Sequence, residues 1–137
     1  MNYLDQTTHS VQALLEDLSS WGPVTTIVFS YGSVFEFKGR FPLGKEGEGF
    51  YNFGHEVPAT GGASGFQGHL RLDNVAHVRF QDRAHRGRPS YAFVFEDDDS
   101  NCIFKVFLGR DLNGEIDRHQ LEKFNRLRSK HDVTILD

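Results

Sequence analysis

The chain has 137 residues, a length typical of one domain built around one hydrophobic core, so we expect residues 1–137 to form a single domain. Its formal net charge is -4 and it has no tract rich in Lys or Arg, which argues against nucleic acid as a partner. No apolar run reaches membrane-spanning length, and the first residues lack the basic and apolar regions of a signal peptide, so the sequence predicts a cytoplasmic protein.

The first third of the chain predicts a helix followed by a β-hairpin. Apolar residues recur at helical spacing before the helix-stopping sequence Trp-Gly-Pro at residues 21–23, and a Thr or Ser between residues 7 and 10 can cap the helix. These apolar residues are Leu4, Val11, Leu14, Leu15 and Leu18. Residues 24–31 and 33–38 are rich in β-branched and aromatic side chains, and Gly32 between them marks a tight turn.

The middle of the chain predicts further strands. A flexible polar connection over residues 44–49 precedes a short strand at 50–53, and a loop at 54–64 leads to a strand around His69. Three more strands are predicted at residues 75–82, 90–96 and 102–108. Cys102, the only cysteine, has no partner for an internal disulfide, and its apolar strand neighbours predict a buried, reduced thiol.

A second helix is predicted near the C-terminus, with Asn113 or Asp117 as its cap. Its helical stripe consists of Ile116, Gln120, Leu121, Phe124 and Leu127. The order helix, many strands, helix predicts an α+β fold, in which an antiparallel β-meander sheet has the two helices packed on its edge or on one face.

His69 lies on the polar side of its predicted strand, because Leu70 and Leu72 share the other side. Gly65 and Gly68 remove side chains close to it, so a broad, flat molecule such as a haem ring can approach the strand there. From this strand alone, a half-exposed histidine on a solvated sheet face is the simpler interpretation.

Three other motifs have ordinary explanations. The glycine-rich loop at residues 61–65 leads into a strand and is not followed by Gly-Lys-Ser/Thr, so nucleotide binding is not expected. The acidic run at residues 96–99 lacks the EF-hand pattern and has the composition of a solvated turn. The seven histidines show no zinc-type spacing with each other or with cysteine.

Several polar residues remain that can converge on the aromatic scaffold. They are Tyr31, Tyr51, His69, Arg71, His77 and Arg79. Such a set suits an apolar cofactor with anionic ends, because the ring gains from burial, Arg pairs with propionates, and iron accepts imidazole or phenolate. Haem fits this chemistry, although not uniquely.

Four blocks of sequence carry a family resemblance. They are Trp-Gly-x-Val-Thr-Thr-Ile-Val at residues 21–28, Phe-Glu-Phe-x-Gly-x-x-Pro at 35–42, Gly-His-Leu at 68–70 and Lys-Val-Phe-Leu-Gly-Arg-Asp at 105–111. In residues, order and spacing they resemble the ChuX/HutX family of cytosolic haem-utilisation carriers. The resemblance extends from about Trp21 to near Leu127, which is most of the chain.

This resemblance implies a fold like half of the larger ChuS/HemS proteins, and a homodimer that mimics their two halves. It also implies a non-enzymatic protein that binds haem in the cytoplasm and passes it to a haem-accepting protein. His69 occupies the family's Gly-His-Ile/Leu position and is the candidate iron ligand, with Arg71 or Arg79 near the propionates. The expected wall residues are Phe29, Tyr31 and Tyr51.

Two positions depart from the family pattern. Phe29 stands where some relatives have a histidine, which excludes two-histidine ligation at that strand. Where relatives have Gly-Tyr-Phe-Asn-Leu, residues 49–53 are Gly-Phe-Tyr-Asn-Phe, so the phenol of Tyr51 moves to the opposite strand face. Two alternatives therefore remain: a haem-degrading enzyme like the larger relatives, or a dimeric fold relative that has lost haem binding and serves as an interaction module.

Overall fold

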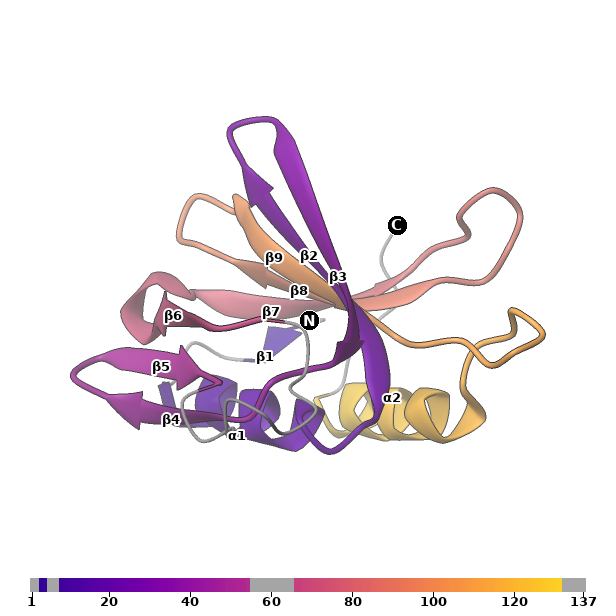
Figure 1. The fold of residues 1–137 in the computed structure, drawn as a ribbon, viewed down its shortest axis with the longest axis horizontal. Helices are drawn as coiled ribbons and strands as arrows, with labels where there is room; N and C mark the ends of the chain where they lie inside the picture. The colour runs from indigo at the N-terminus through magenta and orange to yellow at the C-terminus, as the bar shows by residue number, and fades with distance from the viewer. Residues whose placement is uncertain (1–2, 5–7, 55–65, 132–137) are drawn as a thin grey trace.

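The structure is a computed structural model and describes residues 3–4, 8–54 and 66–131. In the described residues, strands occupy the middle of the chain between two main helices (Figure 1). The elements are β1 (Tyr3–Leu4), α1 (Thr8–Leu18), β2 (Pro23–Ser30), β3 (Ser33–Arg40), β4 (Gly44–Gly47), β5 (Phe50–Phe53), β6 (Gly68–Arg71), a short 3₁₀ helix (Leu72–Asn74), β7 (His77–Asp82), β8 (Tyr91–Glu96), β9 (Cys102–Phe107) and α2 (Arg118–Lys130). The predicted α+β class, with antiparallel strands and a helix towards each end, is confirmed.

The strands form two antiparallel sheets instead of one continuous meander. A six-stranded sheet has the order β1-β7-β8-β9-β2-β3, and a three-stranded sheet has the order β4-β5-β6. Strands β7, β8 and β9 follow one another as a meander, after which β9 pairs with β2. The chain therefore leaves the large sheet after β3, builds the small one, and returns.

The small sheet depends on β4, which the sequence predicts as a flexible connection. That prediction is wrong, because residues 44–47 pair with β5 in an antiparallel hairpin. Glu48 and Gly49 form its two-residue turn with positive φ angles of 55° and 84°, the conformation that matches the twist of the flanking strands. Gly44 must lack a side chain, since a Cβ there would collide with the ring of Tyr51. Because Gly44 and Gly47 are typical of loops, the composition of this segment does not indicate the strand that it forms.

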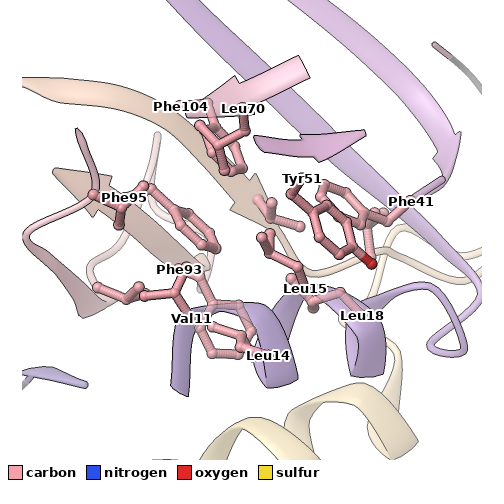
Figure 2. Close-up of a cluster of buried hydrophobic side chains, with 14 of the residues drawn as sticks. Val11, Leu14, Leu15, Leu18, Phe41, Tyr51, Leu70, Phe93, Phe95 and Phe104 are labelled. Atoms are coloured by element: carbon pink, nitrogen blue, oxygen red, sulfur yellow. The ribbon is translucent and has the colours of Figure 1, made fainter. Parts of the chain in front are cut away.

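Both helices and the small sheet cover the same face of the six-stranded sheet (Figure 1). Leu15 and Leu18 of α1 are fully buried in the core that also holds Phe93 of β8, and both lie towards Tyr51 and Phe41 (Figure 2). Phe124 of α2 meets the same aromatic layer, with its ring centroid 5.0 Å from that of Phe93 and 5.5 Å from that of Phe80. The predicted helical residues Val11, Leu14, Leu15, Leu18 and Phe124 are thus in the core, whereas Leu4, predicted with the first helix, lies in β1.

Gln120 joins three parts of the chain at one end of this core. Its side chain is buried; Oε1 accepts a hydrogen bond from the Gly109 amide at 2.7 Å, and Nε2 donates to the carbonyls of Trp21 and Pro23 at 2.9 Å each. A Cβ on Gly109 would collide with the Pro23 carbonyl. Two of the sequence blocks that carry the family resemblance, around Trp21 and around Gly109, thus meet at one helix residue.

The other face of the six-stranded sheet, which we call the open face, carries no helix in the described part of the chain. Its inner strands bear an ion cluster: Glu96 accepts from His77 Nε2 at 2.6 Å and from Arg79 Nη2 at 3.3 Å. Towards β3 the open face becomes apolar, with Phe29 and Val34 opposite each other in the register and both exposed.

Candidate functional site

An apolar pocket lies between the two sheets. It has a volume of about 310 Å³ and is bounded by β2, β3 and β9 of the large sheet and by β5, β6 and the residues just before β6. Its apolar lining includes Val28, Phe35, Phe37, Phe53, Phe66 and Phe104. The volume is at the lower end of the range of about 300–1,000 Å³ that is usual for small-molecule sites.

The aromatic walls of the pocket are held by further aromatic contacts. Phe104 stacks on the buried Phe95 with ring centroids 4.2 Å apart and planes at 11° (Figure 2). From the small-sheet side, Phe66 packs on Phe53 at 5.6 Å and reaches Phe37 of the large sheet at 5.0 Å between centroids. These rings therefore pack against one another on both sides of the pocket.

His69 stands among the few polar residues of the lining, on β6. It is exposed, as the alternation of the strand predicts, while its neighbour Leu70 is buried. Its Nδ1 lies 2.7 Å from Oδ1 of Asn52, the residue directly opposite on β5. Phe50 presents an edge-on ring to the imidazole, with 6.4 Å between the ring centroids. His69 therefore borders the apolar pocket from β6, while its imidazole is held on the strand side that carries Asn52 and Phe50.

The residues around His69 leave space for a flat ligand. Gly68 lines the pocket, and a Cβ built there would meet no heavy atom within 4 Å. Arg71 lies on the same side of β6 as His69, and its guanidinium carbon is 4.6 Å from the centroid of the Phe50 ring. Gly65, the other glycine singled out from the sequence, lies outside the described residues.

The two tyrosines predicted as wall residues lie elsewhere. Tyr51 is fully buried, its ring packs on Phe53 at 5.1 Å between centroids, and its hydroxyl accepts a hydrogen bond from the Gly44 amide at 3.2 Å. Burial raises the pKa of its phenol, so it does not offer a phenolate to a metal. Tyr31 is fully exposed in the two-residue turn between β2 and β3, with φ 49°.

Phe29 and Arg79 lie on the open face, on the far side of the sheet from the pocket. Val28 points into the pocket, so the next residue along β2 points away from it, towards Lys105. Arg79 pairs with Glu96 on the same open face. Of the six candidate residues, the structure thus places His69 in the pocket and Arg71 beside it, and does not bring the other four there.

Sequence reasoning missed the residues that build most of the wall. Phe35 and Phe37 alternate on β3 and pair with Val28 and Thr26 of β2, so a signal was present in the predicted hairpin once its register is known. Phe66 had no comparable signal, because its role depends on how the small sheet sits against the large one.

The remaining candidate groups form no second centre. Cys102 is partly buried, not fully buried as predicted, and this burial raises the pKa of its thiol to about 11. No group of three or more His, Cys, Asp or Glu residues suited to a metal ion occurs within 3–4, 8–54 and 66–131. None of the helices in those ranges is long and apolar enough to span a membrane.

Fold and pocket together define a small α+β protein with an apolar cleft and a histidine at its rim. Residues 5–127 match the family described as haem utilisation ChuX/HutX, and the chain belongs to this family. It is 38% identical over 120 residues to the intracellular heme transport protein HutX of Vibrio cholerae serotype O1. That match covers 88% of this chain and 59% of HutX, so the chain spans less than two thirds of that relative's length.

Solved structures share the fold. The heme binding protein ChuX superposes with a TM-score of 0.78 at 23% identity, covering 96% of this chain and 78% of ChuX. The heme degrading enzyme ChuS of Escherichia coli O157:H7 superposes with a TM-score of 0.67 at 16% identity, covering 92% of this chain and 35% of ChuS. The predicted likeness to a part of the larger ChuS-type proteins is therefore confirmed at the level of the fold.

Proposed function

We propose that the protein is an intracellular haem carrier that binds haem in the pocket between its two sheets, with His69 as the iron ligand. The observation that carries this proposal is His69 at the rim of an aromatic pocket, with its imidazole held by Asn52. Neutral imidazole is a common haem-iron ligand, and an aromatic wall suits the porphyrin ring. The names of HutX as a heme transport protein and ChuX as a heme binding protein support the same cargo.

The surrounding residues take distinct roles in this proposal. Phe35 and Phe37 contact the porphyrin face, in the place expected for Phe29 and Tyr31 from the sequence. Arg71 supplies positive charge for a propionate, because it extends from the same strand face as His69. A cavity of about 310 Å³ covers only part of a porphyrin, so one edge remains outside it. That edge suits release of haem to an accepting protein.

A homodimer is the second part of the proposal. The six-stranded sheet has helices on one face only among the described residues, and its open face bears exposed Phe29 and Val34 at 36% and 52%. A second copy that covers this face would bury both residues. Light scattering is expected to give twice the mass of one chain, with Val34→Asp monomeric and Glu122→Gln, an exposed change on α2, still dimeric. A monomeric wild type would exclude the dimer.

A haemin titration tests the carrier role. Wild type is expected to give a saturable, one-to-one complex with a shifted Soret band. His69→Ala should bind at least about tenfold more weakly and with a different Soret position. Gly68→Leu should also weaken binding, because residue 68 lines the pocket and the new side chain would occupy part of it. His119→Ala, on the exposed side of α2, is the matched control and should match wild type. A wild type without a saturable complex would contradict the proposal.

A reduction experiment separates the carrier from a haem-degrading enzyme. Ascorbate is added to the haem complex in the presence of catalase, and the Soret band is followed. A carrier keeps its Soret band and returns intact haem to an acceptor such as apomyoglobin. Loss of the band with formation of a bilin would assign catalysis to the protein instead.

A further inference from the structure

Asn52 makes contacts on both sides of its side-chain amide. It faces His69 across the β5–β6 ladder, with Oδ1 2.7 Å from Nδ1 of the imidazole. Its Nδ2 lies 3.0 Å from the backbone carbonyl oxygen of Lys45 on β4 and 3.5 Å from that of Phe50. The amide thus links the His69 strand to both other strands of the small sheet.

These carbonyls determine the orientation of the Asn52 amide. A backbone carbonyl oxygen only accepts hydrogen bonds, so the amide atom that faces Lys45 must be the NH₂ group. The atom that faces His69 is then the amide oxygen, which also only accepts. The hydrogen of the short contact must therefore be on Nδ1 of His69. In a neutral imidazole with hydrogen on Nδ1, the lone pair in the ring plane belongs to Nε2.

We propose that Asn52 is a positioning residue that selects Nε2 of His69 as the nitrogen offered to haem iron and strengthens it as a donor. This inference rests on the proposed function, since it takes His69 to be the ligand. Histidines that bind metals usually donate their other N–H to an oxygen, and this bond fixes the ring orientation and raises the basicity of the ligating nitrogen. Here the oxygen comes from a side chain that is itself held by the Lys45 carbonyl.

A second contact restrains the same ring. Phe50 and Asn52 alternate on β5 and so share one side of the strand, with Phe50 edge-on to the imidazole and the two ring planes at 77°. The amide oxygen therefore sets the rotation of the imidazole towards β5, and the Phe50 ring limits its tilt. Such restraint of a ligand by its neighbours lowers the entropy that binding must remove.

The tautomer can be measured without haem. Long-range ¹H–¹⁵N spectra of the apo protein at about pH 8 report which ring nitrogen carries hydrogen, and His69→Ala identifies the His69 signals. Wild type is expected to show hydrogen on Nδ1. Asn52→Leu should move the hydrogen to Nε2, the tautomer that free histidine prefers, whereas Asn125→Ala on the exposed side of α2 should change nothing. Hydrogen on Nε2 in wild type would overturn the inference, whether or not Asn52→Leu folds.

The haem complex supplies a second readout. A stronger bond to Nδ1–H gives the imidazole more anionic character, which favours ferric iron. The reduction potential is therefore expected to fall in the order Asn52→Leu, wild type, Asn52→Asp, and Asn52→Leu should bind haemin about tenfold more weakly. A merely structural role for Asn52 would give no such order, since both variants would shift the potential alike or not at all; that result would overturn the inference.

The two experiments separate this inference from the function on which it rests. If the apo spectra show hydrogen on Nδ1 in wild type and its loss in Asn52→Leu but haemin does not bind, the carrier function fails and the role of Asn52 in setting the tautomer survives. If haemin binds through His69 but neither the imidazole tautomer nor the reduction potential changes when residue 52 is replaced, the carrier function stands and the inference fails.

Discussion

Phe29 and Phe35 lie on the same β-hairpin but on opposite faces of the six-stranded sheet. The register pairs Val28 with Phe35 and Phe29 with Val34, so one ring lines the pocket while the other lies beside Lys105 on the open face. Both residues are partly exposed, Phe29 at 36% and Phe35 at 54%. The hairpin therefore contains two phenylalanines that differ mainly in the face of the sheet on which their side chains lie.

This pair gives a test of which face binds haem. Phe35→Ala is expected to weaken haemin binding about fivefold or more, because burial of part of a phenyl ring against the ligand contributes about 1 kcal/mol. Phe29→Ala should leave the affinity within about twofold of wild type. Soret titrations of both variants measure this, with thermal unfolding as a check that each is folded. A larger loss for Phe29→Ala would place the haem on the open face.

Replacement of Gln120 is expected to destabilise the fold strongly. Gln120→Leu keeps the approximate volume but removes all three hydrogen bonds, and it leaves the Gly109 amide and the carbonyls of Trp21 and Pro23 without this partner. The expected cost is about 2–4 kcal/mol of unfolding free energy, measured by urea denaturation. Glu122→Gln, an exposed change on the same helix, should cost less than about 0.5 kcal/mol. Equal stabilities of the two variants would show that Gln120 does not hold these elements together.

We expect the burial of the Tyr51 phenol to cause a loss of stability at alkaline pH. Its phenol has a pKa raised above the ordinary 10.0 by burial, so its contribution is complete below about pH 10. Above that pH the unfolded phenol ionises first, and stability falls until the pH passes the folded pKa. Urea denaturation across this range should show a steeper fall for wild type than for Tyr51→Phe, in which the other tyrosines remain as an internal control. Parallel curves would mean that Tyr51 ionises normally in the folded protein.

Cys102 should react slowly with thiol reagents. A pKa raised from 9.0 to about 11 lowers the thiolate fraction near neutral pH by roughly 100-fold, and the thiolate is the reactive form. Alkylation by iodoacetamide at about pH 8 is therefore expected to be at least roughly 100-fold slower in native protein than in urea. The native rate should keep rising up to about pH 11. A native rate equal to the unfolded rate would contradict the predicted burial of this thiol.

The parts of the fold that depend on local periodicity could be predicted from the sequence. The helical spacing of apolar residues predicted both helices. Asp117, one of the two predicted caps, is the N-cap of α2, and its side chain accepts a hydrogen bond from the backbone N–H of Gln120. Strand alternation correctly placed His69 on the polar side of β6 and moved Tyr51 away from it. These features need only residues close in the chain, and they involve one face of one element.

The pocket itself could not be predicted in this way, because it lies between elements that are distant in sequence. Phe35 and Phe104 share a wall only because β9 returns to pair with β2. The small sheet was not predicted because the glycines of β4 are typical of a loop. Gly44 is needed there because a side chain would collide with the ring of Tyr51. Phe29 was predicted as a wall residue from its position in a family pattern, which does not say which side of β2 faces this pocket.

The division of the strands into two separate sheets has a mechanical consequence for the pocket. Strand pairing runs within each sheet, and no ladder joins β6 to the six-stranded sheet in the described residues. The width of the gap between His69 and Phe35 is therefore set by aromatic side-chain contacts and not by backbone hydrogen bonds. Any widening of this gap would therefore require those side chains to slide, and it would break no strand pairing.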